Sequence, residues 1–263
     1  MQKVVFITGA SSGIGFSTAQ FFLQKGYKVY GLSRNKPKKA VAFNFIAGDV
    51  TDEVSIENAV KEIMQKENRI DIVINNAGMG ISGASEYATK DEVEKIFEVN
   101  VFGVVNVCRA VIPYLRKTKG HIINVGSVAG ELAIPFQSYY SATKASVHAF
   151  STALRAELLP FGVKVSTVLP GDTKTKFFNN REKSSIEKDK IYGERIQKSL
   201  QVMERDEKNG MSAVSVSKVI YKLTKQKRPS IIKTVGLKYK FFVFLKRILP
   251  TRLVNYVIYK IYG

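Results

Sequence analysis

A tyrosine and a lysine four positions apart, Tyr140 and Lys144, are the residues best suited to proton chemistry. A tyrosine phenol has a pKa of about 10, so alone it is a poor base at neutral pH. Residues at positions i and i+4 share a helix face, where the lysine ammonium would stabilise the phenolate. Such a pair can give a proton to a forming alkoxide or take one from a hydroxyl group. We therefore expect Tyr140 to act as an acid and base assisted by Lys144.

The spacing Tyr-x-x-x-Lys occurs three times, beginning at Tyr140, Tyr221 and Tyr256, so the spacing alone carries little information. Only the first pair has a serine thirteen residues upstream, Ser127; the other two have a lysine and a valine there. Ser127 directly follows an apolar segment that predicts a strand, and open α/β sheets bind ligands at the carboxyl ends of their strands. We expect Ser127 to hold the substrate oxygen and to stabilise the charge that develops on it.

A glycine-rich turn, TGASSGIG at residues 8–15, follows the first apolar segment and leads into a helical segment. Glycines let backbone N–H groups approach a phosphate, and the dipole of the following helix favours negative charge. A turn that needs glycine only for its backbone angles would have the same appearance. Its position in a strand–helix–strand unit favours a pyrophosphate site.

Short Val- and Ile-rich segments alternate with longer helical stretches, which is typical of a parallel sheet covered on both faces. The expected strands are residues 3–8, 28–33, 42–47, 71–75, 121–126, 163–169 and 230–235. The expected helices are residues 14–25, 53–67, 90–115, 138–159 and 214–224. Right-handed crossovers then favour a doubly wound α/β Rossmann fold. We expect one domain over residues 1–263, with a polar lid at 172–209 that has weak helical spacing.

Taken in order, these motifs resemble the short-chain dehydrogenase/reductase family. The resemblance covers residues 3 to about 175 and also includes Asn-Asn-Ala-Gly at 75–78 and Pro-Gly at 170–171. It implies hydride transfer between an alcohol or ketone and a nicotinamide cofactor. It assigns Asn100 to a water-linked proton relay from Lys144, although a buried asparagine could instead be purely structural.

The resemblance and the reasoning above together define two sets of residues. The expected catalytic set is Asn100, Ser127, Tyr140 and Lys144. The expected cofactor-binding set is Gly9, Ser11, Ser12, Gly13, Ile14, Gly15, Ser33, Arg34, Asp49, Val50, Asn76, Ala77, Gly78, Tyr140, Lys144, Pro170, Gly171 and Thr173.

The end of the second expected strand indicates which nicotinamide cofactor is bound. An acidic residue there would accept hydrogen bonds from the adenosine ribose and repel a 2′-phosphate. This chain has Ser33 followed by Arg34, and Ser11 could also contribute. A hydroxyl and a guanidinium suit a phosphate, so NADP(H) is favoured over NAD(H). The alternative is that Arg34 is an ordinary exposed arginine.

Charge is distributed unevenly along the chain. The net charge is +19, and the part from Lys208 onward holds thirteen basic and no acidic residues. Residues 236–263 mix aromatic and aliphatic residues with Lys and Arg, which predicts amphipathic helices broken at Pro250. Such helices could lie on a membrane, cover a lipophilic pocket, pack on a second subunit or simply present a solvated basic face. Interleaving with aliphatic residues disfavours nucleic acid as the partner.

The tail also resembles, more weakly, those of hydroxysteroid and retinol dehydrogenases. This implies a small lipophilic substrate such as a steroid, retinoid or bile acid. The long helices at 90–115 and 138–159 resemble the family's homodimer or homotetramer interface.

The remaining composition narrows the class of protein further. One cysteine, Cys108, excludes an internal disulfide, and with two histidines it offers no convincing metal site. No apolar segment approaches the roughly 20 residues of a membrane span. We expect a cytoplasmic enzyme, with peripheral association with a membrane through the tail left open. The alternatives are a peripheral membrane-binding protein, or a cofactor-sensing protein that uses the fold without turnover.

Overall fold

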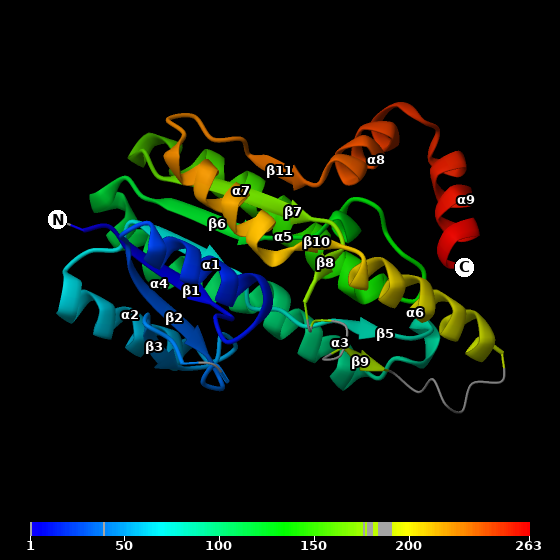
Figure 1. Ribbon diagram of the computed structural model, residues 1–263, viewed down its shortest axis with the longest axis horizontal. Coiled ribbons are helices and arrows are strands. Elements are labelled where there is room, and N and C mark those ends of the chain that lie inside the picture. The colour runs from blue at the N-terminus through cyan, green and yellow to red at the C-terminus, as the bar shows by residue number, and fades with distance from the viewer. Residues whose placement is uncertain (1, 39, 176, 178–180, 184–190) are drawn as a thin grey trace.

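A seven-stranded parallel sheet forms the centre of the molecule (Figure 1). The computed structural model describes residues 2–38, 40–175, 177, 181–183 and 191–263. The strands of the sheet lie in the order β11-β7-β6-β4-β1-β2-β3. Their bounds are β1 Val4–Thr8, β2 Lys28–Ser33, β3 Asn44–Ala47, β4 Ile72–Asn75, β6 His121–Val125, β7 Lys164–Pro170 and β11 Ile232–Val235. The chain builds outward from β1 through β2 to β3 and then crosses to β4 on the other side of β1. The order therefore reverses between β1 and β4, where doubly wound sheets bind their ligands.

Helices cover both faces of this sheet, as the alternation of segments predicts. α1 (Gly13–Gln24) and α7 (Ala213–Lys225) lie together on one face. α2 (Glu53–Glu67), α4 (Gly103–Thr118) and α5 (Ser138–Leu158) pack on the other. Side chains of β1 alternate between the two cores, with Val4 and Phe6 on the α2–α4–α5 side and Val5 and Ile7 on the other. The expected Rossmann architecture is confirmed.

The stretch expected as one helix over residues 90–115 is interrupted by a wider turn. It consists of α3 (Lys90–Phe97), a π-helical turn η2 (Glu98–Phe102) and α4. Asn100 lies in that turn, and π-helical turns often occur at functional sites. By length and composition alone the helical stretch 90–118 could cross a membrane, which is weak evidence. Val107, Val111 and Leu115 of α4 are fully buried in the protein core, so a core helix accounts for the same composition.

The segment expected as a polar lid, residues 172–209, has more structure than its sequence predicts. It contains β8 (Thr173–Lys174), β9 (Glu182–Lys183) and α6 (Gly193–Lys208). β8 pairs with β10 (Met211–Ser212), and β9 pairs with β5 (Ile81–Ser82). Ile196, Leu200 and Met203 face inward on α6, as their spacing predicts, whereas Ile186 lies outside the described residues. The strand expected at residues 42–47 is β3, which begins at residue 44.

The basic tail forms two helices beyond the carboxyl ends of the strands. α8 (Leu237–Ile248) and α9 (Thr251–Tyr262) are separated at Leu249 and Pro250, close to the expected break. Figure 1 places them, in orange-red and red, on the same end of the molecule as α6, and α9 contacts α6. The tail therefore lies at the end of the sheet where a ligand is expected.

The amino ends of β1 and β4 are joined by a buried carboxylate. Asp71 accepts a hydrogen bond from the Val4 N–H at 2.8 Å. Its two oxygens also accept from Nε and Nη2 of Arg69 at 2.9 and 2.6 Å. Asp71 is 6% exposed, so its partners cannot readily turn to water if the carboxylate is removed.

We predict that Asp71→Ala lowers the free energy of unfolding by about 2–4 kcal/mol, because it leaves a buried N–H and a guanidinium unpaired. Lys66→Ala is the control, since Lys66 forms only an exposed pair with Glu62, worth about 0.5 kcal/mol. Urea denaturation followed by circular dichroism measures both. Equal losses in the two variants would contradict the assignment.

Candidate active site

A cavity of about 820 Å³ lies at the carboxyl ends of the strands. It extends from the glycine-rich turn after β1, past Ser127 and Tyr140, to the inner faces of α8 and α9. Of the residues expected in the catalytic and cofactor-binding sets, all line this cavity except Gly15 and Asn100. The structure thus brings segments from the whole length of the chain into one site.

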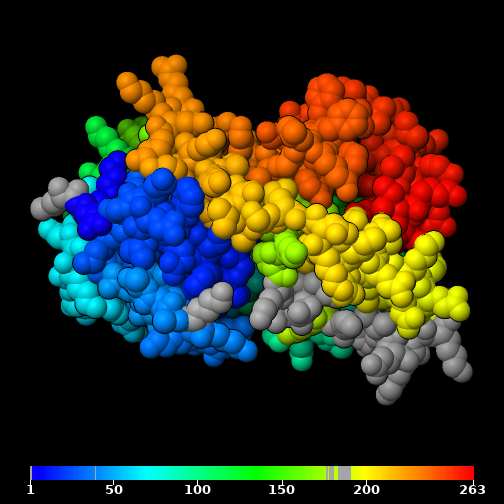
Figure 2. All heavy atoms as spheres, viewed as in Figure 1, coloured from blue at the N-terminus to red at the C-terminus, as the bar shows by residue number. Residues whose placement is uncertain are grey.

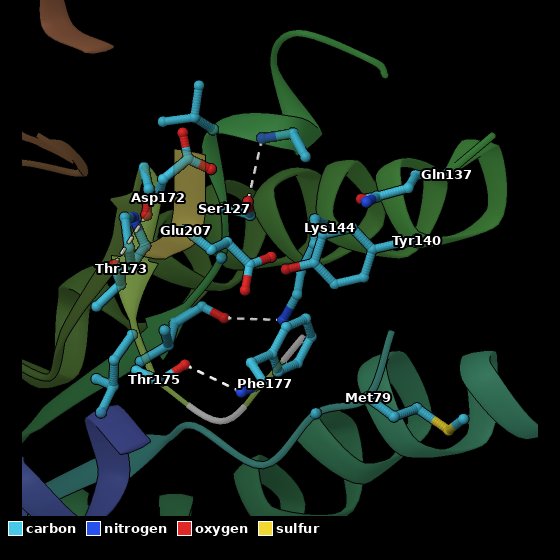
Figure 3. Close-up of a pocket in the computed structure, with 18 of the residues that line it drawn as sticks. Met79, Ser127, Gln137, Tyr140, Lys144, Asp172, Thr173, Thr175, Phe177 and Glu207 are labelled. Carbon is cyan, nitrogen blue, oxygen red and sulfur yellow. Dashed lines mark hydrogen bonds between the residues drawn. The ribbon is translucent and has the colours of Figure 1, made fainter. Parts of the chain in front are cut away.

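Ser127, Tyr140 and Lys144 meet in this cavity, between the glycine-rich turn and the tail helices (Figure 3). Ser127 follows β6, and its Oγ accepts from the Ala129 N–H at 3.1 Å. Tyr140 and Lys144 lie one turn apart on α5, with Lys144 Nζ 5.7 Å from the centre of the Tyr140 ring. Lys144 Nζ also donates to the Val125 carbonyl at 3.2 Å. The arrangement expected from the spacing is the one that the fold produces.

Burial acts in opposite directions on the two titrating groups. It raises the pKa of the Tyr140 phenol, an effect partly opposed by hydrogen bonding to Ser127. Burial also lowers the pKa of Lys144 from 10.5 to about 8. Each shift disfavours a lone charge, so a phenolate and an ammonium formed next to each other stabilise one another. The pair is therefore suited to holding the negative charge that remains after Tyr140 gives up its proton.

Asn100 lies behind Lys144. Its Oδ1 accepts from the Met79 N–H at 2.8 Å, and its Nδ2 donates to the Met79 carbonyl at 2.9 Å and to Thr143 Oγ1 at 3.0 Å. A Cβ added at Gly78 would lie 3.2 Å from Asn100 Oδ1 and 3.4 Å from Lys144 Nζ. The Asn100 side chain thus positions the backbone beside Lys144, while its part in a proton relay stays a prediction.

The glycine-rich turn exposes its backbone to the cavity. Gly9 and Gly13 have φ angles of +67° and +56°, which side-chain-bearing residues rarely adopt. A Cβ at Gly15 would lie 2.3 Å from the Gly9 carbonyl oxygen and 2.4 Å from Asn76 Nδ2. Gly15 is therefore required for close packing inside the turn rather than for lining the cavity. The turn fits a dinucleotide pyrophosphate, with backbone N–H groups of 11–14 available at the start of α1.

The adenosine end of the cavity contains the residues expected there. Ser33 is buried and its hydroxyl donates to the Asn35 carbonyl at 3.0 Å, while Arg34 is exposed at the rim. Asp49 and Val50 line the same end after β3. On the other side, Thr8 Oγ1 accepts from the N–H groups of Asn76 and Ala77, each at 3.1 Å. Thr8 is therefore structural.

A buried ion pair that the sequence did not indicate faces the catalytic tyrosine. Arg181 Nη2 and Glu207 Oε1 are 2.6 Å apart, with side chains only 4% and 13% exposed. Figure 3 shows the Glu207 carboxylate directed toward the Tyr140 hydroxyl, with Asp172 nearby. The Phe177 ring packs against that of Tyr140 at 5.8 Å between centres. Asp172, Phe177, Arg181 and Glu207 all lie in the segment expected as a lid, whose sequence has no motif that singles them out.

The inner faces of the tail helices form the far wall of the cavity. Apolar wall residues are Phe242, Leu245, Leu249, Val254, Val257, Ile258 and Ile261. The Tyr239 hydroxyl donates to the Asp172 carboxylate, and a Cβ at Gly171 would overlap the Tyr239 ring. Val243 packs with Val128 and Leu169 below the catalytic loop. Of the roles considered for the tail, covering a lipophilic pocket is the one supported by these contacts.

Comparisons with known proteins agree with this site. The family model of the short chain dehydrogenases matches residues 3–185, so the chain belongs to the short-chain dehydrogenase/reductase family. A 3-ketodihydrosphingosine reductase of Bacteroides thetaiotaomicron is 40% identical over 97% of this chain and 96% of its own length. An NADPH-dependent 1-acyldihydroxyacetone phosphate reductase of Saccharomyces cerevisiae is 33% identical over 68% of this chain and 64% of its own length.

Solved structures show the same architecture. A short-chain dehydrogenase from Streptomyces avermitilis superposes with a TM-score of 0.82 at 28% identity, covering 92% of this chain and 91% of the other. ElxO with NADP bound has a TM-score of 0.75 at 26% identity, covering 92% and 100%. The chain is therefore an oxidoreductase of this family, with a nucleotide-binding Rossmann fold.

We predict that Lys144→Met stabilises the protein at pH 7 by about 1–3 kcal/mol while abolishing turnover, because burying the ammonium is costly. The unfolded lysine keeps its proton up to about pH 10.5 and the folded one only to about 8. The wild type therefore gains stability between these values, and the advantage of the variant should shrink there. Denaturation at several pH values tests this, with exposed Lys218→Met as the control. A stability difference that does not change with pH would contradict it.

Proposed function

We propose that this protein is an NADPH-dependent reductase of a long-chain keto lipid. The observation that carries the proposal is the position of Ser127, Tyr140 and Lys144 in one cavity, between the glycine-rich turn and a wall of mostly apolar tail residues. The residues of the glycine-rich turn and of the loops after β4 and β7 would hold a dihydronicotinamide cofactor, which would supply hydride for the carbonyl carbon. Tyr140 donates its proton to the carbonyl oxygen, Ser127 hydrogen-bonds that oxygen, and Lys144 stabilises the phenolate that remains.

The preference for NADP(H) is supported by Arg34 and Ser33 at the end of β2. Arg34 is exposed at the cavity rim, where its guanidinium is available to a 2′-phosphate. ElxO, 26% identical, was solved with NADP, and the yeast relative is described as NADPH-dependent. NAD(H) is the less favoured alternative.

The charges around Tyr140 support a cationic head group on the substrate. Asp172, Asp206 and Glu207 line the cavity, where Lys238 is also found. Arg181 is already paired with Glu207. An added phosphate would be repelled by these carboxylates, whereas an ammonium beside the ketone would be attracted. The B. thetaiotaomicron relative is named for 3-ketodihydrosphingosine, a long-chain amino ketone, and is similar over nearly its whole length.

Two other readings remain as competitors for the experiment. One is a steroid, retinoid or bile acid as substrate, which the tail resemblance favours. The other is a peripheral membrane-binding or cofactor-sensing protein without turnover. The oriented Tyr140–Lys144 pair supports catalysis over both forms of the second reading.

We expect Tyr140→Phe to lower kcat for a long-chain amino ketone by about 10²–10⁴-fold, because the proton donor is lost. NADPH affinity, measured by the change in NADPH fluorescence on binding, should stay nearly constant. Tyr139→Phe is the matched control, since the Tyr139 hydroxyl only donates to the Ser85 carbonyl on the exposed side. NADPH oxidation is measured with the amino ketone, an acyldihydroxyacetone phosphate and a ketosteroid. Undiminished turnover in Tyr140→Phe would refute the mechanism, and faster turnover of either competitor would refute the substrate.

Arg34→Asp should reduce the ratio of kcat/KM with NADPH to kcat/KM with NADH by about 10–100-fold, through lost charge-assisted hydrogen bonds and added repulsion. Lys36→Asp, exposed two residues along and not lining the cavity, makes the same change in charge and should have little effect. If the two variants shift the ratio equally, the effect is general electrostatics and Arg34 does not bind the phosphate.

A further inference from the structure

The outer surface of the tail helices is unusually apolar. Among the described residues, seventeen large hydrophobic side chains are exposed, and nine of them lie on α8 and α9. These are Leu237, Phe241, Phe244, Ile248, Leu253, Tyr256, Val257, Tyr259 and Ile261. Val257 and Ile261 also line the cavity, so the other seven make up the outer apolar surface. Such a concentration marks an interaction surface rather than chance exposure.

On α8 these side chains form one stripe. Leu237, Phe241, Phe244 and Ile248 are spaced at i, i+4, i+7 and i+11, so they share one helix face. Leu237 is 83% and Phe244 56% exposed. The opposite side of α8 is apolar too, because Phe242 and Leu245 line the cavity. On this side, α8 is the single helix between the cavity and the solvent.

Cations accompany this stripe, with no acids among them. Lys240 and Arg247 on α8 and Arg252 and Lys260 on α9 are exposed. The chain has no Asp or Glu after Glu207. Figure 2 shows α8 and α9, in orange-red and red, as a continuous convex surface at one end of the molecule. The outer faces of α8 and α9 together form the tail surface.

We propose that the tail surface docks on a bilayer that contains anionic lipids, with the apolar stripe at the boundary between headgroups and acyl chains. Amphipathic helices with large apolar side chains and Lys or Arg beside them bind in this way. Each basic residue near an anionic surface adds to the attraction. Because the inner faces of the same helices line the cavity, docking would place that cavity beside the acyl chains. This last consequence depends on the proposed function, whereas docking itself does not.

Charge argues for a bilayer over a second copy of the chain. In a two-fold contact through the tail surface the same patch would face itself, bringing basic residues against basic residues. Like charges opposed across an interface are unfavourable. An anionic leaflet complements both the cations and the apolar stripe.

The test is co-sedimentation of the full chain with vesicles of phosphatidylcholine alone or mixed with phosphatidylglycerol. We expect at least about tenfold stronger binding to the mixed vesicles, weakened by salt. Phe241→Glu with Phe244→Glu should reduce that binding about tenfold or more. Lys240→Glu with Arg247→Glu should remove the preference for phosphatidylglycerol. None of these four residues lines the cavity.

Matched controls make the same changes elsewhere on the surface. Val54→Glu with Leu159→Glu replaces two exposed apolar residues, 62% and 69% exposed, outside the tail. Lys227→Glu with Arg228→Glu reverses two exposed cations in the loop before β11. Both controls should bind vesicles like the wild type.

Binding that survives in the Phe variant, or falls equally in the controls, would overturn the proposal. So would a dimer in analytical ultracentrifugation that the Phe variant abolishes, because the tail surface would then be a subunit contact. Tyr140→Phe should sediment with vesicles as the wild type does. A failure of turnover therefore leaves docking intact, and a failure of docking leaves turnover on a short, water-soluble ketone intact.

Discussion

A buried lysine next to a partly buried tyrosine is the constraint around which the site is arranged. Lys144 is 6% exposed, and no ion pair with a carboxylate is found for it among the described residues. Its ammonium is held by the Val125 carbonyl, and burial lowers its pKa to about 8. The buried ammonium is costly on its own, and for the same reason it effectively stabilises the Tyr140 phenolate. A negative charge beside a positive one is strongly favoured in a site of low dielectric constant.

Close backbone packing is needed to keep that pair in place. A Cβ at Gly130 would lie 2.8 Å from the Lys144 backbone carbon, so the turn after Ser127 rests directly on α5. On the other side the π-helical turn lets Asn100 reach the Met79 backbone and Thr143. The geometry of the pair is therefore supported by α5, by the π-helical turn before α4 and by the loops after β4 and β6. None of these supports acts alone.

The tail gives the family's common site a particular character. Tyr239 joins α8 to Asp172, in the loop that follows β7, and apolar residues of both tail helices close the cavity. Seven of the eleven tail residues that line the cavity are apolar, and a polar or nucleotide-linked substrate would find few hydrogen-bonding partners among them. An acyl chain needs none. The cavity wall and the exposed tail surface are two sides of the same helices.

The sequence alone determined the features set by local spacing. The turn at residues 8–15, the Tyr140–Lys144 pair on one helix face and the alternating strands and helices follow from helical and strand periodicity and the conformational freedom of glycine. The Rossmann fold could be predicted for the same reason. Eighteen of the twenty expected site residues line the cavity, whereas Gly15 and Asn100 support the site from behind.

Only the tertiary structure decided what surrounds the substrate. Arg181 and Glu207 are 26 residues apart and form a buried ion pair because α6, which ends at Lys208, packs against β8. The amphipathic pattern of the tail predicted two helices, yet an amphipathic pattern specifies a buried face without specifying what buries it. That the inner face covers the catalytic cavity depends on long-range packing against Gly171, Leu169 and α6, which no local spacing encodes.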